Sequence, residues 1–216
     1  MQSKIYLIRH GITEGNLKHW YYGATDIPLT EDGKAALRAF AAEGVYPPFQ
    51  GLLLTSGLLR TEQTAEEIYG PRQHAVIEAL RENNFGAFEC KNHEELLAEP
   101  EYRNWLDSFA DQDYVIGGGE SWNQFRSRIQ QGWEQLLSLH LQHCHEVAKD
   151  GEGGEIPETI MICHGGVISA LLNILFPTEG KNMYDWCPEP GLGYALLLDM
   201  AHVTGYERLH SQRENE

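Results

Sequence analysis

The stretch that decides the fold lies near the start of the chain and reads Ile5-Tyr6-Leu7-Ile8-Arg9-His10-Gly11. Its first four residues form a short apolar run, which is typical of a buried central strand. The run ends abruptly in a guanidinium, an imidazole and a glycine, groups that a core strand does not need unless they face something polar. Ligands of open α/β sheets bind outside the carboxyl ends of the strands. Arg9 and His10 therefore stand where such a fold places a ligand-binding site. The alternative interpretation is structural: the strand ends there and His10 caps it.

A second stretch of the same design lies far along the chain, Thr159-Ile160-Met161-Ile162-Cys163-His164-Gly165-Gly166. It again predicts a buried strand, and residues 167–176 predict a helix directly after it. Each strand delivers a histidine to its carboxyl end, and the glycine that follows lets a ligand approach the backbone closely. A structural role does not readily explain this repetition. We therefore expect His10 and His164 to lie close together at one edge of a sheet.

Strand and helix patterns alternate through the rest of the chain. Thr30 is the expected N-cap of a helix that ends at Gly44, since its hydroxyl can accept a hydrogen bond from the first turn. This alternation predicts an α/β fold of three layers, with a mostly parallel sheet flanked by helices, in one domain over residues 1–216. The polar tail from Glu207 to Glu216 is expected to fray. Further strands are expected at 51–55, 75–77 and 194–198.

Two further polar side chains stand near the predicted strand ends. A helix over residues 58–69 follows the strand that ends at Ser56, and its free N–H groups suit an anion. Arg60, in the first turn, would add a guanidinium fork there. Glu82 lies in a loop between the apolar anchors Leu80 and Phe85. Taken alone, a solvated first-turn arginine and an ordinary surface glutamate are the simpler interpretations.

Composition limits the classes of protein and partner. The chain has 216 residues, a formal net charge of −16 and four cysteines without CxxC pairing. The negative charge argues against nucleic acid and anionic membranes as partners. The chain has neither an apolar run long enough to span a membrane nor a secretory leader at its start, and its cysteines read as reduced thiols, so we expect a cytoplasmic protein.

Two segments differ from the alternating pattern. Residues 91–120 predict two short helices and a Gly-rich loop, interpreted as a lid inserted over the site. Ser121 is the expected cap of a long helix with apolar residues on one face. That helix ends in His140-Leu-Gln-His-Cys-His145, which resembles metal-ligand chemistry. No further pair at zinc spacing accompanies it, so we interpret it as a polar helix end.

Six motifs follow one another along the chain: Arg9-His-Gly-Ile-Thr-Glu-Gly-Asn16, Gly23-x-x-Asp-x-Pro-Leu-Thr-x-x-Gly33, Ser56-x-x-Leu-Arg-Thr-x-Gln-Thr-Ala65, Leu80-x-Glu-x-x-Phe-Gly-x-Phe-Glu89, Gly119-Glu-Ser121 and Cys163-His-Gly-Gly166. Together these motifs resemble the histidine phosphatase superfamily, also called phosphoglycerate-mutase-like. They extend over nearly the whole chain in the family's order, and the branch they resemble is that of bacterial small-molecule phosphatases similar to α-ribazole phosphatase. Two positions depart from the family pattern: Cys90 follows Glu89 where glycine is usual, and Gly57 follows Ser56 where aspartate is usual.

The resemblance implies a phosphoryl-transfer site that acts without metal or cofactor. His10 would be the nucleophile, held in the attacking tautomer because its other ring nitrogen donates to a fixed acceptor such as a backbone carbonyl. Glu82 would be the general acid and base. Thr13 and Gly23 would contact the substrate. The phosphate would be bound by Arg9, Asn16, Arg60, His164 and Gly165.

The resemblance implies a metal-independent phosphomonoesterase that forms a phosphohistidine and acts on a small phosphorylated metabolite. A phosphoglycerate-type mutase shares these residues, but mutases carry extra lysines and arginines in the lid, where this chain has Lys91 and Arg103 among many acids. A phosphoprotein-binding module is the other alternative, and it would be expected to lose His10 or Glu82. The substrate and the assembly, for which a homodimer is one option, are left open.

Overall fold

A six-stranded mixed sheet forms the centre of the computed structural model, which describes residues 1–49, 51–107, 112–149 and 156–210. The strand order is β3-β2-β4-β1-β5-β6. Four neighbouring strands run parallel, whereas β5 is antiparallel to β1 and β6 is antiparallel to β5. The predicted α/β fold with a mostly parallel sheet is confirmed. The strands are β1 (Gln2–Arg9), β2 (Leu52–Thr55), β3 (Ala75–Val76), β4 (Glu158–Cys163), β5 (Gly193–Asp199) and β6 (His202–Arg208).

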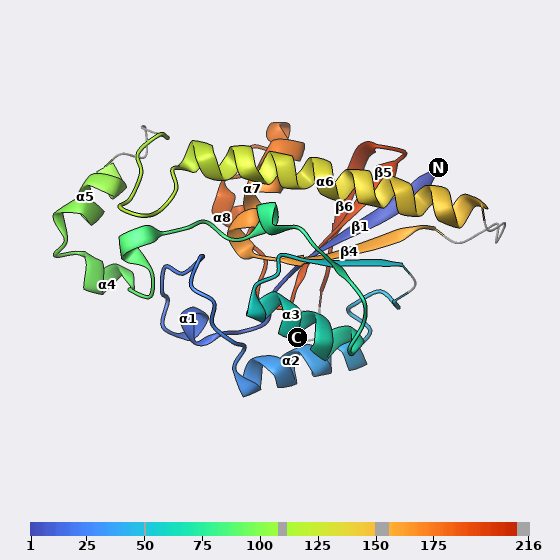
Figure 1. The fold of residues 1–216 in the computed structure, drawn as a ribbon, viewed down its shortest axis with the longest axis horizontal. Coiled ribbons are helices and arrows are strands. Elements are labelled where there is room, and N and C mark those ends of the chain that lie inside the picture. Colours follow the sequence, from blue (N-terminus) through green and yellow to red (C-terminus); the bar gives the residue numbers. More distant parts are fainter. Residues whose placement is uncertain (50, 108–111, 150–155, 211–216) are drawn as a thin grey trace.

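Helices cover both faces of the sheet, as Figure 1 shows. The long helix α6 (Trp122–Lys149) and α7 (Gly165–Leu175) lie on one face, and α2 (Glu31–Ala42) and α3 (Leu59–Tyr69) lie on the other. The expected caps are present, because Thr30 Oγ1 accepts from Gly33 N–H and Ser121 Oγ accepts from Gln124 N–H. The shorter helices are α1 (Glu14–Leu17), α4 (His93–Leu96), α5 (Pro100–Asp107) and α8 (Met183–Trp186).

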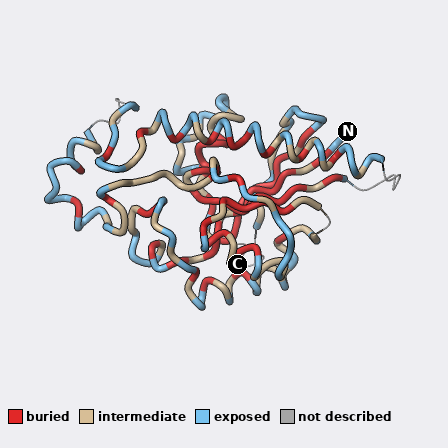
Figure 2. Tube along the Cα trace, in the orientation of Figure 1, coloured by how far each residue is buried: buried red, intermediate tan, exposed pale blue. Residues whose placement is uncertain are grey.

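Buried residues concentrate along the sheet and on the helix faces turned toward it (Figure 2). One apolar cluster packs α6 and α7 against the sheet, and a second packs α2 and α3 against the opposite face. A third, smaller cluster joins α4 and α5 to the loop around Phe88, away from the sheet. The segment predicted as a lid thus has its own small core, and its residues 108–111 lie outside the described part of the chain. No helix of the described residues is both long and apolar enough to span a membrane.

Two sequence predictions need correction. The chain makes a further strand, β6, so Glu207 and Arg208 are paired with β5 rather than frayed; residues 211–216 lie outside the described part. His140 is not at a polar helix end. Its side chain is fully buried, and its ring nitrogens hydrogen-bond Thr159 Oγ1 and Ser3 Oγ, each over 2.8 Å. No cluster of three or more His, Cys, Asp or Glu side chains suited to a metal is found among the described residues.

The burial of His140 predicts that the protein loses stability as the pH falls. Burial, aided by the neighbouring His143, lowers the pKa of His140 to about 4. Between pH 6.5 and about 4 the unfolded chain binds a proton that the folded chain refuses, so the free energy of unfolding decreases with decreasing pH. This histidine alone should cost about 2 kcal/mol between pH 7 and pH 5. Urea unfolding of the wild type and of His140→Gln at both pH values checks this. The variant should show the smaller pH dependence, and an equal dependence would contradict the assignment.

Candidate active site

His10 and His164 come together because the strands that carry them are neighbours. β1 and β4 pair in parallel with Arg9 opposite Cys163, and the His10 N–H donates to the Cys163 carbonyl over 3.0 Å. The two imidazole rings lie with their centroids 5.3 Å apart, at the carboxyl edge of the sheet. The repeated strand-histidine-glycine design therefore brings both rings to one place, as predicted.

One hydrogen bond fixes the tautomer of His10. Its Nδ1 lies 2.7 Å from the Gly11 carbonyl, which can only accept, so Nδ1 carries the proton and Nε2 is left with its lone pair. The Gly11 N–H in turn donates to Thr64 Oγ1 over 3.0 Å, which holds this turn against α3. Burial, and then the charges of Arg60 and Arg9, lower the pKa of His10 well below its usual value. His10 is therefore neutral at pH 7.

His164 is neutral as well, with the opposite tautomer. Arg60 Nε donates to its Nδ1 over 3.3 Å, so the proton sits on Nε2, which donates to Ser56 Oγ over 2.8 Å. Burial, and then the charge of Arg60 and the neighbouring His10, lower the pKa of His164 well below its usual value. His164 also occupies the N-cap position of α7, so the free N–H groups of the first turn of that helix lie next to it.

Arg60 is fully buried, and its partners in the loop after Tyr22 are backbone carbonyls rather than carboxylates. Nη1 donates to Thr25 O over 2.9 Å and Nη2 to Gly23 O over 2.8 Å. Glu89 holds this loop, since its carboxylate accepts from the N–H groups of four residues, Gly23, Ala24, Thr25 and Phe85. The role of Glu89 is not predictable from its residue type, because its four partners come from two separate segments.

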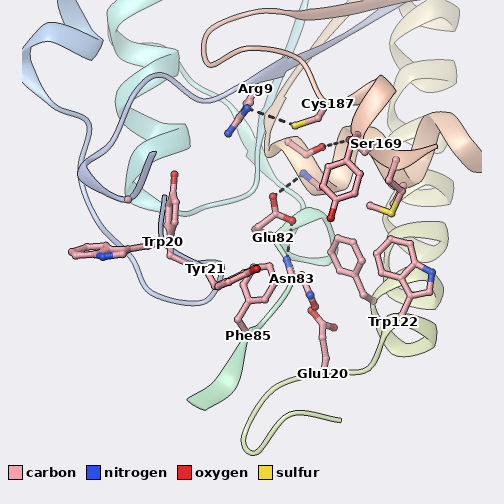
Figure 3. Close-up of a pocket in the computed structure, with 18 of the residues that line it drawn as sticks. Arg9, Trp20, Tyr21, Glu82, Asn83, Phe85, Glu120, Trp122, Ser169 and Cys187 are labelled. Carbon is pink, nitrogen blue, oxygen red and sulfur yellow. Dashed lines mark hydrogen bonds between the residues drawn. The ribbon is translucent and has the colours of Figure 1, made fainter. Parts of the chain in front are cut away.

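Arg9 has an unused donor beside these histidines. Its Nη1 donates to Pro188 O over 2.7 Å and lies 3.6 Å from Cys187 Sγ, a contact visible in Figure 3. Its Nε is buried without a hydrogen-bond partner among the described residues. A buried N–H of a cation without an acceptor is costly, so this position suits an anion.

Glu82 lies at the N-terminus of α7, the helix that His164 caps, and lines the same cavity as His10. Its Oε2 accepts from Gly166 N–H and its Oε1 from Asn83 N–H, both over 2.9 Å (Figure 3). A Cβ at Gly166 would collide with this carboxylate, which accounts for glycine there. The loop that carries Glu82 is fixed by Arg128, which donates to the carbonyls of Ala79, Arg81 and Glu82 and pairs with Glu120. Sequence reasoning missed Arg128.

Thr13, Asn16 and Gly23 have structural partners of their own. Thr13 is buried, caps α1 together with Asn16, and donates its hydroxyl to Tyr22 Oη over 2.7 Å. Asn16 lines the cavity next to His10, although its Oδ1 already accepts from Thr13 N–H. Neither Thr13 nor Gly23 lines the cavity, so the geometry gives them a role in holding Asn16 and Arg60.

A cavity of about 950 Å³ opens in front of these groups. Arg9, His10, Glu82 and Gly165 line its inner end. This volume is far larger than a phosphate needs, and the rest of the wall combines aromatic side chains with polar and small residues. The aromatic side chains come from the loop after α1, the loop of Glu82, α5 and the loop after it, the start of α6, and α8; they are Trp20, Tyr21, Tyr22, Phe85, Trp105, Tyr114, Trp122, Phe125 and Tyr184.

Comparison with known proteins places the chain in a family. The sequence profile described as histidine phosphatase superfamily (branch 1) matches residues 5–191, which include every residue of the candidate site. The chain belongs to the histidine phosphatase superfamily.

Relatives within the superfamily have different names. The adenosylcobalamin/alpha-ribazole phosphatase of Escherichia coli K12 is 26% identical over 209 residues, which cover 93% of each chain. A probable phosphoglycerate mutase of Serratia proteamaculans is 32% identical over 140 residues, which cover 63% of this chain and 64% of the relative. The crystal structure of the alpha-ribazole phosphatase from Shigella flexneri superposes with a TM-score of 0.74 at 24% identity, over 97% of this chain and 96% of the other. That likeness shows a shared fold.

The two departures from the superfamily pattern, Cys90 and Gly57, both lie where the backbone has a positive φ. Cys90, where glycine is usual, has a φ of 59°, so a side chain is held in the left-handed region that favours glycine. Gly57 has a φ of 79°, and a Cβ there would lie 2.7 Å from Val76 Cγ1. Both positions lie next to residues that hold the site, Glu89 and Ser56, rather than in the cavity wall.

Proposed function

We propose that this member of the histidine phosphatase superfamily is a metal-independent phosphomonoesterase that forms a phosphohistidine on His10. The observation that carries the proposal is the hydrogen bond from His10 Nδ1 to the Gly11 carbonyl. It leaves the Nε2 lone pair of a neutral imidazole at the wall of a cavity whose inner end holds cations and free N–H groups. A neutral imidazole in a fixed tautomer is the form that attacks phosphorus.

In the first step His10 Nε2 attacks the phosphorus atom of the monoester. The Nε2–P bond forms as the bond from phosphorus to the leaving oxygen breaks. Glu82, in its protonated form, gives its proton to that oxygen so that an alcohol rather than an alkoxide departs. The position of Glu82 supports this role, because the Gly166 N–H places its carboxyl group beside the inner end of the cavity.

In the second step water replaces the alcohol. Glu82, now a carboxylate, takes a proton from the water as its oxygen attacks phosphorus and the Nε2–P bond breaks. Inorganic phosphate leaves, and neutral His10 and protonated Glu82 are restored. Unaided hydrolysis of phosphate monoesters is so slow that a site must lower the barrier by on the order of 20 kcal/mol or more.

The charge that develops on the phosphoryl oxygens is stabilised by groups that are already in place. The unpartnered Arg9 Nε and the Gly165 N–H at the start of α7 are available as donors. Arg60 donates to His164, whose ring lies beside that of His10, and neither of the two lines the cavity. Donors that need no rearrangement contribute most in a site that excludes water. Asn16, on the cavity wall, completes the proposed phosphate-binding set.

The aromatic residues of the cavity wall support a proposal for the substrate class. Trp20, Tyr21 and Phe85 lie on one side of Glu82 and Trp122 on the other (Figure 3). We propose that these faces pack against a ring-bearing or apolar leaving group of a small phosphorylated metabolite. The segment of α4 and α5 contributes Trp105 to the wall, which supports its role as the lid that selects this group.

A phosphoglycerate-type mutase is the second candidate, favoured by the named relative from Serratia proteamaculans. Such a mutase returns the phosphoryl group to a sugar acid. Lys91 and Arg103 are the cations of the 91–120 segment, and neither lines the cavity. Arg103 Nε is instead bound to the Leu97 carbonyl. The 91–120 segment therefore supplies the cavity with neither a lysine nor an arginine to hold a strongly anionic acceptor, which favours water.

Replacing His10 should remove the covalent step. His10→Ala is expected to abolish turnover while the far-ultraviolet circular dichroism stays that of the wild type. Rapid quenching of the wild type with substrate labelled in its phosphoryl group should trap a phosphoenzyme that is labile to acid and stable to base, the behaviour of phosphohistidine. Turnover retained by the variant, or label that survives acid, would rule out the role of His10.

Replacing Glu82 should affect substrates with poor leaving groups most. Glu82→Gln keeps an oxygen for the Gly166 N–H but cannot supply the proton, so hydrolysis of an alkyl phosphate should fall at least 100-fold. Hydrolysis of p-nitrophenyl phosphate should fall much less, because nitrophenolate leaves without a proton.

Arg128→Met, which frees the loop of Glu82, should show the same leaving-group dependence in weaker form. Arg38→Met removes an exposed arginine that pairs with Glu67 on the far side of the sheet and serves as the matched control. Equal slowing of both substrates in Glu82→Gln would assign this carboxyl group to binding or folding.

Hydrolysis should exceed phosphoryl exchange. With and without 2,3-bisphosphoglycerate, conversion of 3-phosphoglycerate to 2-phosphoglycerate is expected to be slower than phosphate release from the best monoester in a screen of phosphorylated metabolites. The reaction should also continue in EDTA. Mutase turnover that equals or exceeds this hydrolysis would favour the second candidate, and loss of turnover in EDTA would contradict metal independence.

A further inference from the structure

Arg126 differs from the other arginines of the described chain. It is exposed on the second turn of α6, lines the cavity, and has no hydrogen-bond, ion-pair or ring partner among the described residues. The eight other described arginines each have such a partner: Arg9, Arg38, Arg60, Arg72, Arg81, Arg103, Arg128 and Arg208. Arg126 is therefore a free cation on the cavity wall of a strongly acidic protein.

Arg126 lines the cavity on the side of Trp122. It follows Trp122 by one helical turn, so the two side chains share a face of α6. Figure 3 shows Trp122 on the far side of Glu82 from Trp20, and Arg9 well away from Trp122. Asn173, on α7, is a further polar residue of the wall. Arg126 is thus separate from the cations that we assign to the phosphate.

The carboxylates of the cavity wall do not neutralise Arg126. Glu82 is held by two backbone N–H groups, and Glu120 is paired with Arg128. Glu189 follows Cys187 and Pro188 in a loop that contacts Arg9 through the Cys187 sulfur and the Pro188 carbonyl. The guanidinium fork of Arg126 keeps its donors for a group that enters the cavity, and such a fork matches a carboxylate in geometry and charge.

We propose that Arg126 determines substrate specificity by binding one carboxylate on the outer end of the leaving group. The proposal rests on the proposed phosphatase function, whose aromatic wall would hold the ring between the phosphate and this carboxylate. It restricts the substrate to a monoester whose leaving group carries an apolar or ring-bearing body and one further negative charge.

The test compares phenyl phosphate with 3- and 4-carboxyphenyl phosphate, which share a ring and differ in one charge. For at least one carboxyphenyl isomer, Arg126→Ala should lower kcat/KM about tenfold, mainly through KM, which corresponds to about 1.4 kcal/mol. With phenyl phosphate the same variant should stay within about twofold of the wild type. Arg126→Lys should retain part of the preference, and Arg38→Ala, which removes a charge far from the cavity, should retain all of it.

A binding measurement separates this proposal from the proposed function. In the His10→Ala background, calorimetric titration should show the carboxyphenyl isomer binding more weakly once Arg126→Ala is added, with phenyl phosphate unaffected. If the wild type hydrolyses none of the three compounds but this difference in Kd is seen, the proposed function fails and the role of Arg126 stands. An equal effect of Arg126→Ala on all three compounds, or no effect on any, overturns the role of Arg126.

Discussion

The hydrogen bond from His10 Nδ1 to the Gly11 carbonyl is the constraint on which the site depends. It determines which ring nitrogen keeps a lone pair, and the rest of the structure holds its two partners still. Pairing of β1 with β4 fixes the His10 backbone through Cys163, and Thr64 fixes the Gly11 N–H from α3. A strand end, a neighbouring strand and a helix therefore determine the state of one imidazole. None of these contacts requires a ligand, so the site is organised before a substrate enters.

The electrostatics of the site follow from how its cations are bound. Arg60 is buried against two backbone carbonyls and a neutral histidine, and Arg9 is bound to a carbonyl and a thiol. Carbonyls satisfy the N–H groups without cancelling the charge, so a positive potential survives locally in a protein with a net charge of −16. Burial, and then this potential, lower the pKa of His10 and of His164 and keep both rings neutral. A carboxylate partner would also stabilise the Arg60 guanidinium, but it would cancel the positive charge and so weaken the attraction for phosphate.

Sequence patterns predicted the elements that depend on local order and missed those that depend on distant contacts. The strand-histidine-glycine repeats, the caps at Thr30 and Ser121 and the two short helices after Lys91 are short-range patterns, and the structure contains each of them. β6 was missed because its sequence contains Gly205 and charged residues at its end, which are not typical of a strand. Pairing with β5 stabilises it. The partners of His140, Glu89 and Arg128 come from segments far along the chain, which residue type does not reveal. Arg126 was missed for a related reason, since only the fold shows that its side chain reaches the cavity.

The tautomer of His10 is the most direct test of this account. Long-range nitrogen–proton correlation spectra of the protein labelled with nitrogen-15, assigned with the His10→Ala variant, report which imidazole nitrogens carry protons. At pH 6, below the usual pKa of histidine, the account predicts a neutral His10 ring with a proton on Nδ1 and none on Nε2. A ring that is doubly protonated at that pH, or protonated on Nε2 alone, would contradict it.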